Sequence, residues 1–169
     1  MDISKFKTHD WLVIGGGIGM IIFGLFFDWW KISGFGSGAN AFDFFFTGTV
    51  PWLLLIAAAV VTVLLAMEKI DAKSLPWPLV IALATVLAAV LLLIRFIFNP
   101  GAPDGVDRGI GLILAVIAGL VSAAGGVMGF LASGGSIADL ADMNKMKSAF
   151  DKGDDNGGSP MPPPPPPPM

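Results

Sequence analysis

The chain has 169 residues, of which 54% are hydrophobic and only 14% charged, and its mean hydropathy is +0.77. About a quarter of the residues of a typical soluble domain are charged, so this composition excludes that class and predicts an integral membrane protein. With a formal net charge of −3 we expect no nucleic-acid partner, and the lack of cysteine excludes disulfides and thiolate metal sites.

The first apolar stretch, Trp11 to Trp30, contains glycines that partly fit a dinucleotide-binding fingerprint. Gly15 and Gly17 stand at its first two glycine positions, but Met20 takes the third, where a glycine lets helix and strand pack closely. The stretch then stays apolar as far as Asp28, whereas a nucleotide-binding helix needs a polar outer face. We interpret it as a membrane span.

A cleaved signal peptide is the alternative for this stretch. Lys5 and Lys7 precede it, and the small residues Ala39–Ala41 satisfy the cleavage pattern. The apolar run is longer than a typical signal core, however, and the candidate cleavage site lies well beyond Phe27. We therefore expect the span to be retained.

The sequence predicts an all-α fold, an integral membrane four-helix bundle in residues 1–132. Crossing the hydrocarbon core takes about 20 apolar residues in a helix. Pro51 and Pro78 mark helix starts, where a missing N–H group costs nothing. The predicted spans are Trp11–Trp30, Val50–Met67, Leu79–Phe98 and Gly109–Ala132.

Basic residues set the expected orientation. Four spans place both termini on one side, and that side has seven lysines, whereas the other has Lys31 and Arg108. Because basic loops stay in the cytoplasm, we predict that both termini are cytoplasmic. The seven are Lys5, Lys7, Lys69, Lys73, Lys145, Lys147 and Lys152.

Small residues are spaced for helix packing in the first and fourth spans. Gly15 and Gly19 lie one turn apart, which lets a neighbouring backbone approach closely. The fourth span repeats this spacing, so we expect both spans to be buried; the alternative is that glycine is simply common in membrane helices. The spaced small residues of the fourth span are Gly111, Ala115, Gly119, Ser122 and Gly126.

Ionisable residues within the spans are few. Asp28 and Arg95 lie near the outer boundary, where they either pair, are solvated separately or form a functional site. The polar groups at mid-depth are Thr62, Thr85 and Ser122. This pattern argues against a pump or coupled transporter, and a single histidine, His9, excludes a bis-histidine haem within one chain.

The first outer loop, residues 31–49, carries four phenylalanines around Asp43. We expect it to lie on the membrane as a short helix or re-entrant turn, with Trp29, Trp30 and Trp52 as headgroup anchors. It is interpreted as an aromatic belt, a docking surface for a partner's membrane helices or a lipid-binding site. The phenylalanines are Phe42, Phe44, Phe45 and Phe46.

Several segments together resemble a known group of proteins. A glycine-bearing first span and a tryptophan pair are followed by "NAFDFFFTG", "PWLLLIAAA" and "RGIGLILAV". In this order they resemble the uncharacterised small four-span membrane proteins common in actinobacteria, over most of Trp11 to Ala132. The resemblance implies a bacterial plasma membrane and no particular chemistry.

The C-terminal part divides in two. Ser136 can cap an amphipathic helix within residues 133–152, resting on the membrane or a partner. Residues 153–169 cannot bury a core, so we expect a disordered tail that ends in a polyproline II rod, Pro162 to Pro168. The rod is either a spacer or a ligand for a cytoplasmic polyproline-binding partner.

No residue set in the sequence supports catalysis or a cofactor. We expect a non-enzymatic accessory or scaffold subunit of a larger cell-envelope membrane complex, in contact with lipids and other membrane proteins. The alternative is a small oligomeric pore or carrier, whose polar line would come from Thr62, Thr85 and Ser122 at an oligomeric interface.

Overall fold

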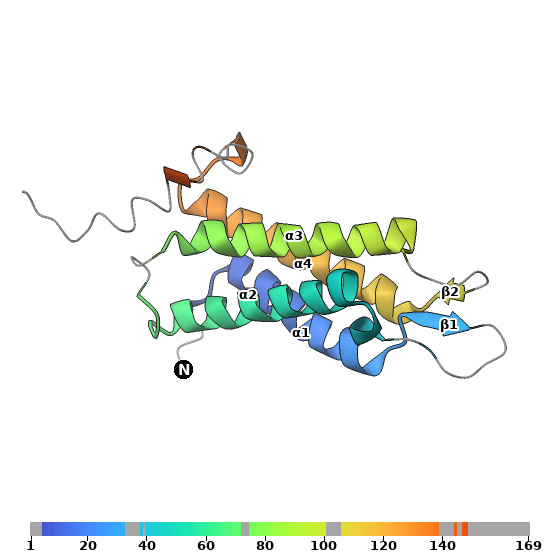
Figure 1. Cartoon of the computed structure of the whole chain (residues 1–169). Coiled ribbons are helices and arrows are strands. Elements are labelled where there is room, and N and C mark those ends of the chain that lie inside the picture. Colours follow the sequence, from blue (N-terminus) through green and yellow to red (C-terminus); the bar gives the residue numbers. More distant parts are fainter. Residues whose placement is uncertain are drawn as a thin grey trace, which may run out of the picture.

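The structure, a computed structural model, confirms an all-α membrane fold with four helices that are long and apolar enough to span a bilayer (Figure 1). They are α1 (Thr8–Phe26), α2 (Val50–Ala66), α3 (Trp77–Phe98) and α4 (Ile110–Ala132). The residues that the structure describes are 5–32, 38, 40–71, 75–100, 106–138, 144, 147 and 148.

The helices form an antiparallel bundle in which α1 packs on α2 and α4, and α3 packs on the same two helices. The N-terminal end of α1 and the C-terminal end of α4 therefore lie together, at what we call the tail end (Figure 1). The opposite end carries two short strands, β1 (Trp30–Ile32) and β2 (Val106–Arg108), and we call it the ribbon end.

The strands pair antiparallel, with Trp30 opposite Arg108 and Lys31 opposite Asp107. This ribbon joins the connection after α1 to the connection after α3. Backbone hydrogen bonds continue the link, because the N–H groups of Gly109 and Gly111 donate to the carbonyl oxygens of Trp29 and Asp28 at 2.8 and 3.1 Å.

The first span ends earlier than the sequence predicted. Helix α1 stops at Phe26, and Trp29 and Trp30 are 0% and 2% exposed. The Trp29 indole donates to the carbonyl oxygen of Phe23 at 3.1 Å and so satisfies a backbone group at the helix end. The expectation that these tryptophans are headgroup anchors was wrong, since both lie inside the protein.

The second span begins earlier than predicted. A short 3₁₀ turn, η2 (Ala41–Asp43), precedes a single π-helical turn, η3 (Phe45–Thr49), which runs directly into α2. Asn40 caps η2 by accepting a hydrogen bond from the Phe42 N–H at 2.8 Å. Gly48 fits against the backbone of Ala41, where any side chain would collide. This contact folds the phenylalanine segment back over the bundle.

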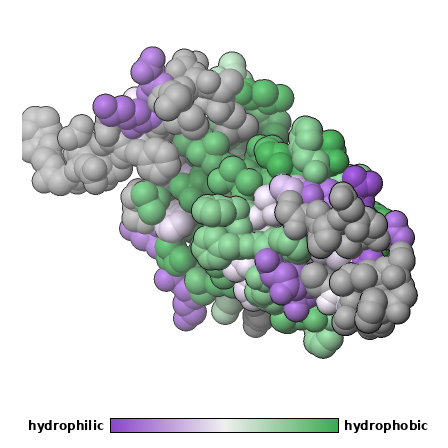
Figure 2. All heavy atoms as spheres, turned by 45° about the vertical axis from the view of Figure 1, so that its right-hand side comes forward, coloured by the Kyte–Doolittle hydropathy of each residue, from purple (hydrophilic) through white to green (hydrophobic). Residues whose placement is uncertain are grey.

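Apolar side chains cover much of the outside of the helices. Figure 2 shows hydrophobic residues over the body of the bundle and hydrophilic residues toward its ends, which is the pattern of a protein surrounded by lipid. The buried core at the ribbon half is equally apolar, and its fully enclosed members include Met20, Leu55, Leu92 and Leu112.

The glycines of α1 pack differently from our expectation for Gly15. Gly15 is exposed, and no atom lies within 4 Å of where its Cβ would stand. Its neighbours make the contacts instead: a Cβ on Gly16 would stand 2.6 Å from Ser122 Cβ, and one on Gly17 2.5 Å from Ala59 Cβ. Of the predicted pair, Gly15 makes no contact within the bundle, whereas Gly19 does. Gly19 is half-buried, with Ala118 Cβ 3.4 Å from its Cβ position.

On α4 the small residues face neighbouring helices. Gly126 lies against Thr85 and the backbone of Ala82, while a Cβ on Gly119 would stand 2.7 Å from Leu92 Cδ1. Gly111 approaches the carbonyl oxygen of Phe27 at the end of α1. Ala115 and Ser122 are fully buried. These residues bring α4 close to both α1 and α3.

Candidate functional site

Two polar clusters interrupt the apolar bundle, one at each end. The cluster at the ribbon end centres on Arg95, which lies about one turn before the end of α3 and is 1% exposed. Its guanidinium lies against two aromatic rings, with Cζ 3.4 Å from the centroid of Phe44 and 4.7 Å from that of Trp30. The rings themselves meet edge to face, 6.0 Å apart. A desolvated cation over aromatic faces is a favourable contact.

The hydrogen bonds of this cluster are incomplete. Arg95 Nη1 donates to the carbonyl oxygen of Pro100. Arg95 Nε and Nη2, the indole N–H of Trp30 and the side-chain oxygen of Asn99 are all buried without a hydrogen-bond partner. Three buried donors and one acceptor are therefore unsatisfied here, although buried polar groups in proteins are nearly always hydrogen-bonded.

The structure does not bring Asp28 and Arg95 together. No ion pair joins them within the described ranges, because Arg95 turns toward the aromatic rings and Asp28 is an exposed residue just after α1. The pairing considered from the sequence is therefore absent. Asp28 contributes its backbone carbonyl oxygen, which accepts the hydrogen bond from Gly111.

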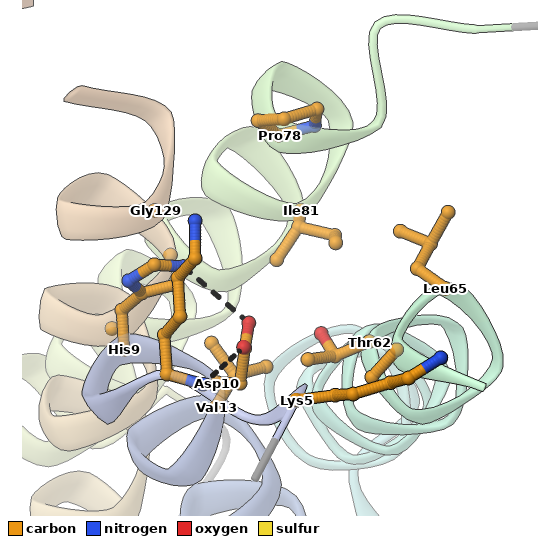
Figure 3. A pocket seen from close by; sticks show the side chains of 13 residues that line it. Lys5, His9, Asp10, Val13, Thr62, Leu65, Pro78, Ile81 and Gly129 are labelled. Atoms are coloured by element: carbon orange, nitrogen blue, oxygen red, sulfur yellow. Dashed lines mark hydrogen bonds and ion pairs between the residues drawn. The ribbon is translucent and has the colours of Figure 1, made fainter. Parts of the chain in front are cut away.

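The second cluster surrounds a pocket of about 210 Å³ at the tail end, lined by residues of all four helices and of the segment before α1 (Figure 3). The polar side chains of its wall include those of Lys5, His9, Asp10 and Thr62. The apolar ones include those of Val13, Leu65, Pro78 and Ile81. The pocket is thus polar on one part of its wall and apolar on another. Sequence analysis did not find it, because its residues are far apart in the chain.

Short contacts organise the charged groups of this pocket. Asp10 accepts a hydrogen bond from the backbone N–H of Lys7 at 2.8 Å, and its other oxygen lies 3.5 Å from His9 Nε2. Lys5 forms an ion pair with Glu68 at 2.6 Å, which ties the segment before α1 to the end of α2. The hydrogen bond from Lys5 and its charge lower the pKa of the Glu68 carboxyl.

The mid-depth polar residues lie inside the bundle. Thr62, Thr85 and Ser122 are 4%, 0% and 0% exposed. The two threonines donate to carbonyl oxygens of their own helices, Thr62 to Ala58 and Thr85 to Ile81. Hence none of the three faces outward, and the oligomeric interface that a pore would have needed from them does not exist on the surface of this bundle.

The four phenylalanines around Asp43 divide into one that is half-buried and three that are exposed. Phe44 is half-buried and covers Arg95, whereas the other three are exposed. Phe42 packs edge to face on Trp52 at 5.1 Å, and Phe45 packs on Phe46 at 5.2 Å. The predicted polyproline rod, Pro162 to Pro168, the predicted disordered tail in 153–169 and most of the predicted helix in 133–152 lie outside the described residues.

No group of three or more histidine and acidic side chains that could hold a metal ion occurs in the part of the chain that the structure describes. Comparison with protein families, with curated proteins and with solved structures finds no match to this chain.

Proposed function

We propose that this integral membrane protein acts as a non-enzymatic accessory or scaffold subunit of a larger membrane complex. The exposed face of α1 carries this proposal. Gly15 stands there among large apolar residues, with Trp11 and Ile18 49% and 53% exposed one turn to either side. A glycine in a helix costs about 1 kcal/mol relative to alanine and gains nothing here within the bundle. A second helix packing closely on Gly15 would offset that cost.

An apolar groove beside this face supports the same proposal. It lies between α1 and α2, has a volume of about 260 Å³ and includes Ile18, which is also on the exposed face of α1. In lipid, close packing against such a surface is a main source of helix association. The groove is lined by Ile14, Gly17, Ile18, Ile21, Ile56, Ala59, Val60, Val63 and Leu64.

The alternative of a pore or carrier has less support. Between the tail-end pocket and Arg95, most residues of the bundle interior are apolar, and Met20, Leu55 and Leu92 are each 0% exposed. A solute path through a single bundle would have to displace this core. The three buried hydroxyl residues do not provide a path between neighbouring copies either.

The membrane and the orientation remain proposals from the sequence. The bias of basic residues and the resemblance to actinobacterial proteins favour a bacterial plasma membrane, with the tail end in the cytoplasm. A cytoplasmic partner that binds the seven-proline run belongs to the same proposal.

Single cysteines test this orientation. We expect Lys31→Cys, at the ribbon end, to react with a membrane-impermeant maleimide in intact cells, and Ser133→Cys, exposed at the tail end, to react only after lysis. The natural chain has no cysteine, so no background labelling interferes. Losing Lys31 only strengthens the charge bias. The reverse labelling pattern would place the tail end outside.

Enlarging Gly15 tests the accessory role. We expect Gly15→Leu to retain the thermal stability of the protein in detergent, because its Cβ meets no atom within 4 Å. The same variant should lose membrane proteins that crosslink to the natural chain, since a leucine there keeps a partner helix at a distance.

The matched control is Ala57→Leu, which enlarges an exposed alanine on α2. It should retain both the stability and the partners. An unchanged set of crosslinked membrane proteins in Gly15→Leu would contradict the proposal that this face of α1 holds a partner.

A further inference from the structure

The unsatisfied groups of Arg95 have a definite geometry. The Nε–H and one Nη2–H bond of a guanidinium are parallel and point to the same side, where they match the two oxygens of a phosphate or carboxylate. In Arg95 these two nitrogens are the ones without a partner, while Nη1 already donates to Pro100. The Phe44 and Trp30 rings lie against the guanidinium and hold this donor edge in a fixed place.

A third unsatisfied donor belongs to the same cluster. The indole N–H of Trp30 is buried without an acceptor, and the Trp30 ring centroid is only 4.7 Å from Arg95 Cζ. No carboxylate within the described ranges forms an ion pair with Arg95. A buried cation without an anion is costly, so among the described residues the cluster lacks an acidic group rather than another donor.

The depth of Arg95 indicates where that acidic group comes from. Arg95 lies one turn before Phe98, the last residue of α3, which is about 4.5 Å along the helix axis. The cluster is therefore at the boundary between hydrocarbon and headgroups, where phosphate groups are abundant.

We propose that the Nε–H and Nη2–H edge of Arg95, together with the Trp30 indole, is a binding site for a phosphate group at the ribbon end. Both a phospholipid headgroup and free phosphate present this chemistry. Asn99, whose buried side-chain oxygen also lacks a partner, lies one turn after Arg95 and offers an acceptor to a hydroxyl or ammonium group next to the phosphate.

Binding to the purified full-length protein tests this site. Delipidated protein in detergent is titrated with short-chain phosphatidylglycerol, with inorganic phosphate and with acetate, and its thermal unfolding and native mass spectrum are followed. We expect phosphatidylglycerol or phosphate to bind and to raise the unfolding temperature. Arg95→Lys keeps the charge but loses the paired donors, so it should bind about 10- to 100-fold more weakly.

Arg108→Lys is the matched control. Arg108 is at the same end, lies 5.2 Å from the Phe96 ring centroid and donates to the carbonyl oxygen of Ile97, but it is exposed. This variant should bind as the natural protein does. If Arg95→Lys fails to fold, Trp30→Phe replaces it, because it keeps an aromatic ring and removes only the indole donor; it should weaken binding by about tenfold.

The outcomes separate the sources. Tight binding of phosphatidylglycerol alone identifies a lipid site, and equal competition by inorganic phosphate identifies a site for the free anion. Binding of acetate alone would point to a partner's carboxylate and overturn the proposal. Equal binding by natural protein and Arg95→Lys, or no binding at all, would also overturn it and leave ordered water as the partner of these donors.

Discussion

Replacing Gly16 by leucine should strongly destabilise the bundle. A Cβ at this position would stand 2.6 Å from Ser122 Cβ and 2.7 Å from the carbonyl oxygen of Ala118, so a side chain meets the backbone of α4, which cannot move aside alone. Overpacking of this kind costs up to about 3 kcal/mol in soluble proteins. We expect a lower unfolding temperature in detergent and a smaller yield of folded protein.

The control is the adjacent residue. Gly15→Leu adds the same side chain one position earlier, on the exposed face of α1, and should leave the unfolding temperature unchanged. The two variants have the same composition, so a difference between them reports the direction of the side chain. Similar destabilisation of both would contradict the described rotation of α1 in the bundle.

Replacing Trp30 by alanine should also strongly lower the free energy of unfolding. Trp30 is 2% exposed and packs in the core cluster beside Arg95 and Phe44. Removing a buried tryptophan side chain costs about 3–5 kcal/mol, and here it also removes one aromatic face from a buried cation. Chemical unfolding followed by the fluorescence of the remaining tryptophans measures the loss.

Trp11→Ala is the comparison for this variant. Trp11 is 49% exposed on α1 and makes an aromatic contact with Phe6 at 5.3 Å. Removing the Trp11 side chain should lower the free energy of unfolding by well under half as much as removing the Trp30 side chain does. If the order were reversed, Trp30 would be the interfacial anchor that the sequence had suggested, and the described contact of the Trp30 ring with Arg95 would be wrong.

The sequence predicted the helices because span length and apolarity are local properties. All four expected spans correspond to helices of the structure, although several ends differ by a few residues. Helix α1 runs from Thr8 to Phe26, the second span begins at Phe45 and α3 begins at Trp77. The differences arise where contacts beyond the span determine the ends. Helix α1 stops before Trp29 because the connection after α1 pairs there with the connection after α3, and pairing between distant segments leaves no periodic signal in one sequence.

The candidate sites were less predictable for a similar reason. A small-residue spacing identifies a face that can pack, but adjacent glycines at positions 15, 16 and 17 offer three faces, and only neighbouring helices select among them. Arg95 was singled out by its charge, yet its partners proved to be aromatic rings and a carbonyl oxygen. The sequence suggested Asp28 as the partner of Arg95 only because the two side chains carry opposite charges.

The ribbon also constrains how the protein is made. Trp30 pairs with Arg108, so the strand that completes the ribbon emerges from the ribosome only after three spans have been synthesised. Until then the carbonyl oxygens of Trp29 and Asp28 lack the N–H donors that Gly109 and Gly111 later supply. Helices α1 and α2 are therefore in the membrane before β1 can pair with β2. A chain truncated before residue 106 would stay without this pairing, exposed to the proteases that remove incomplete membrane proteins.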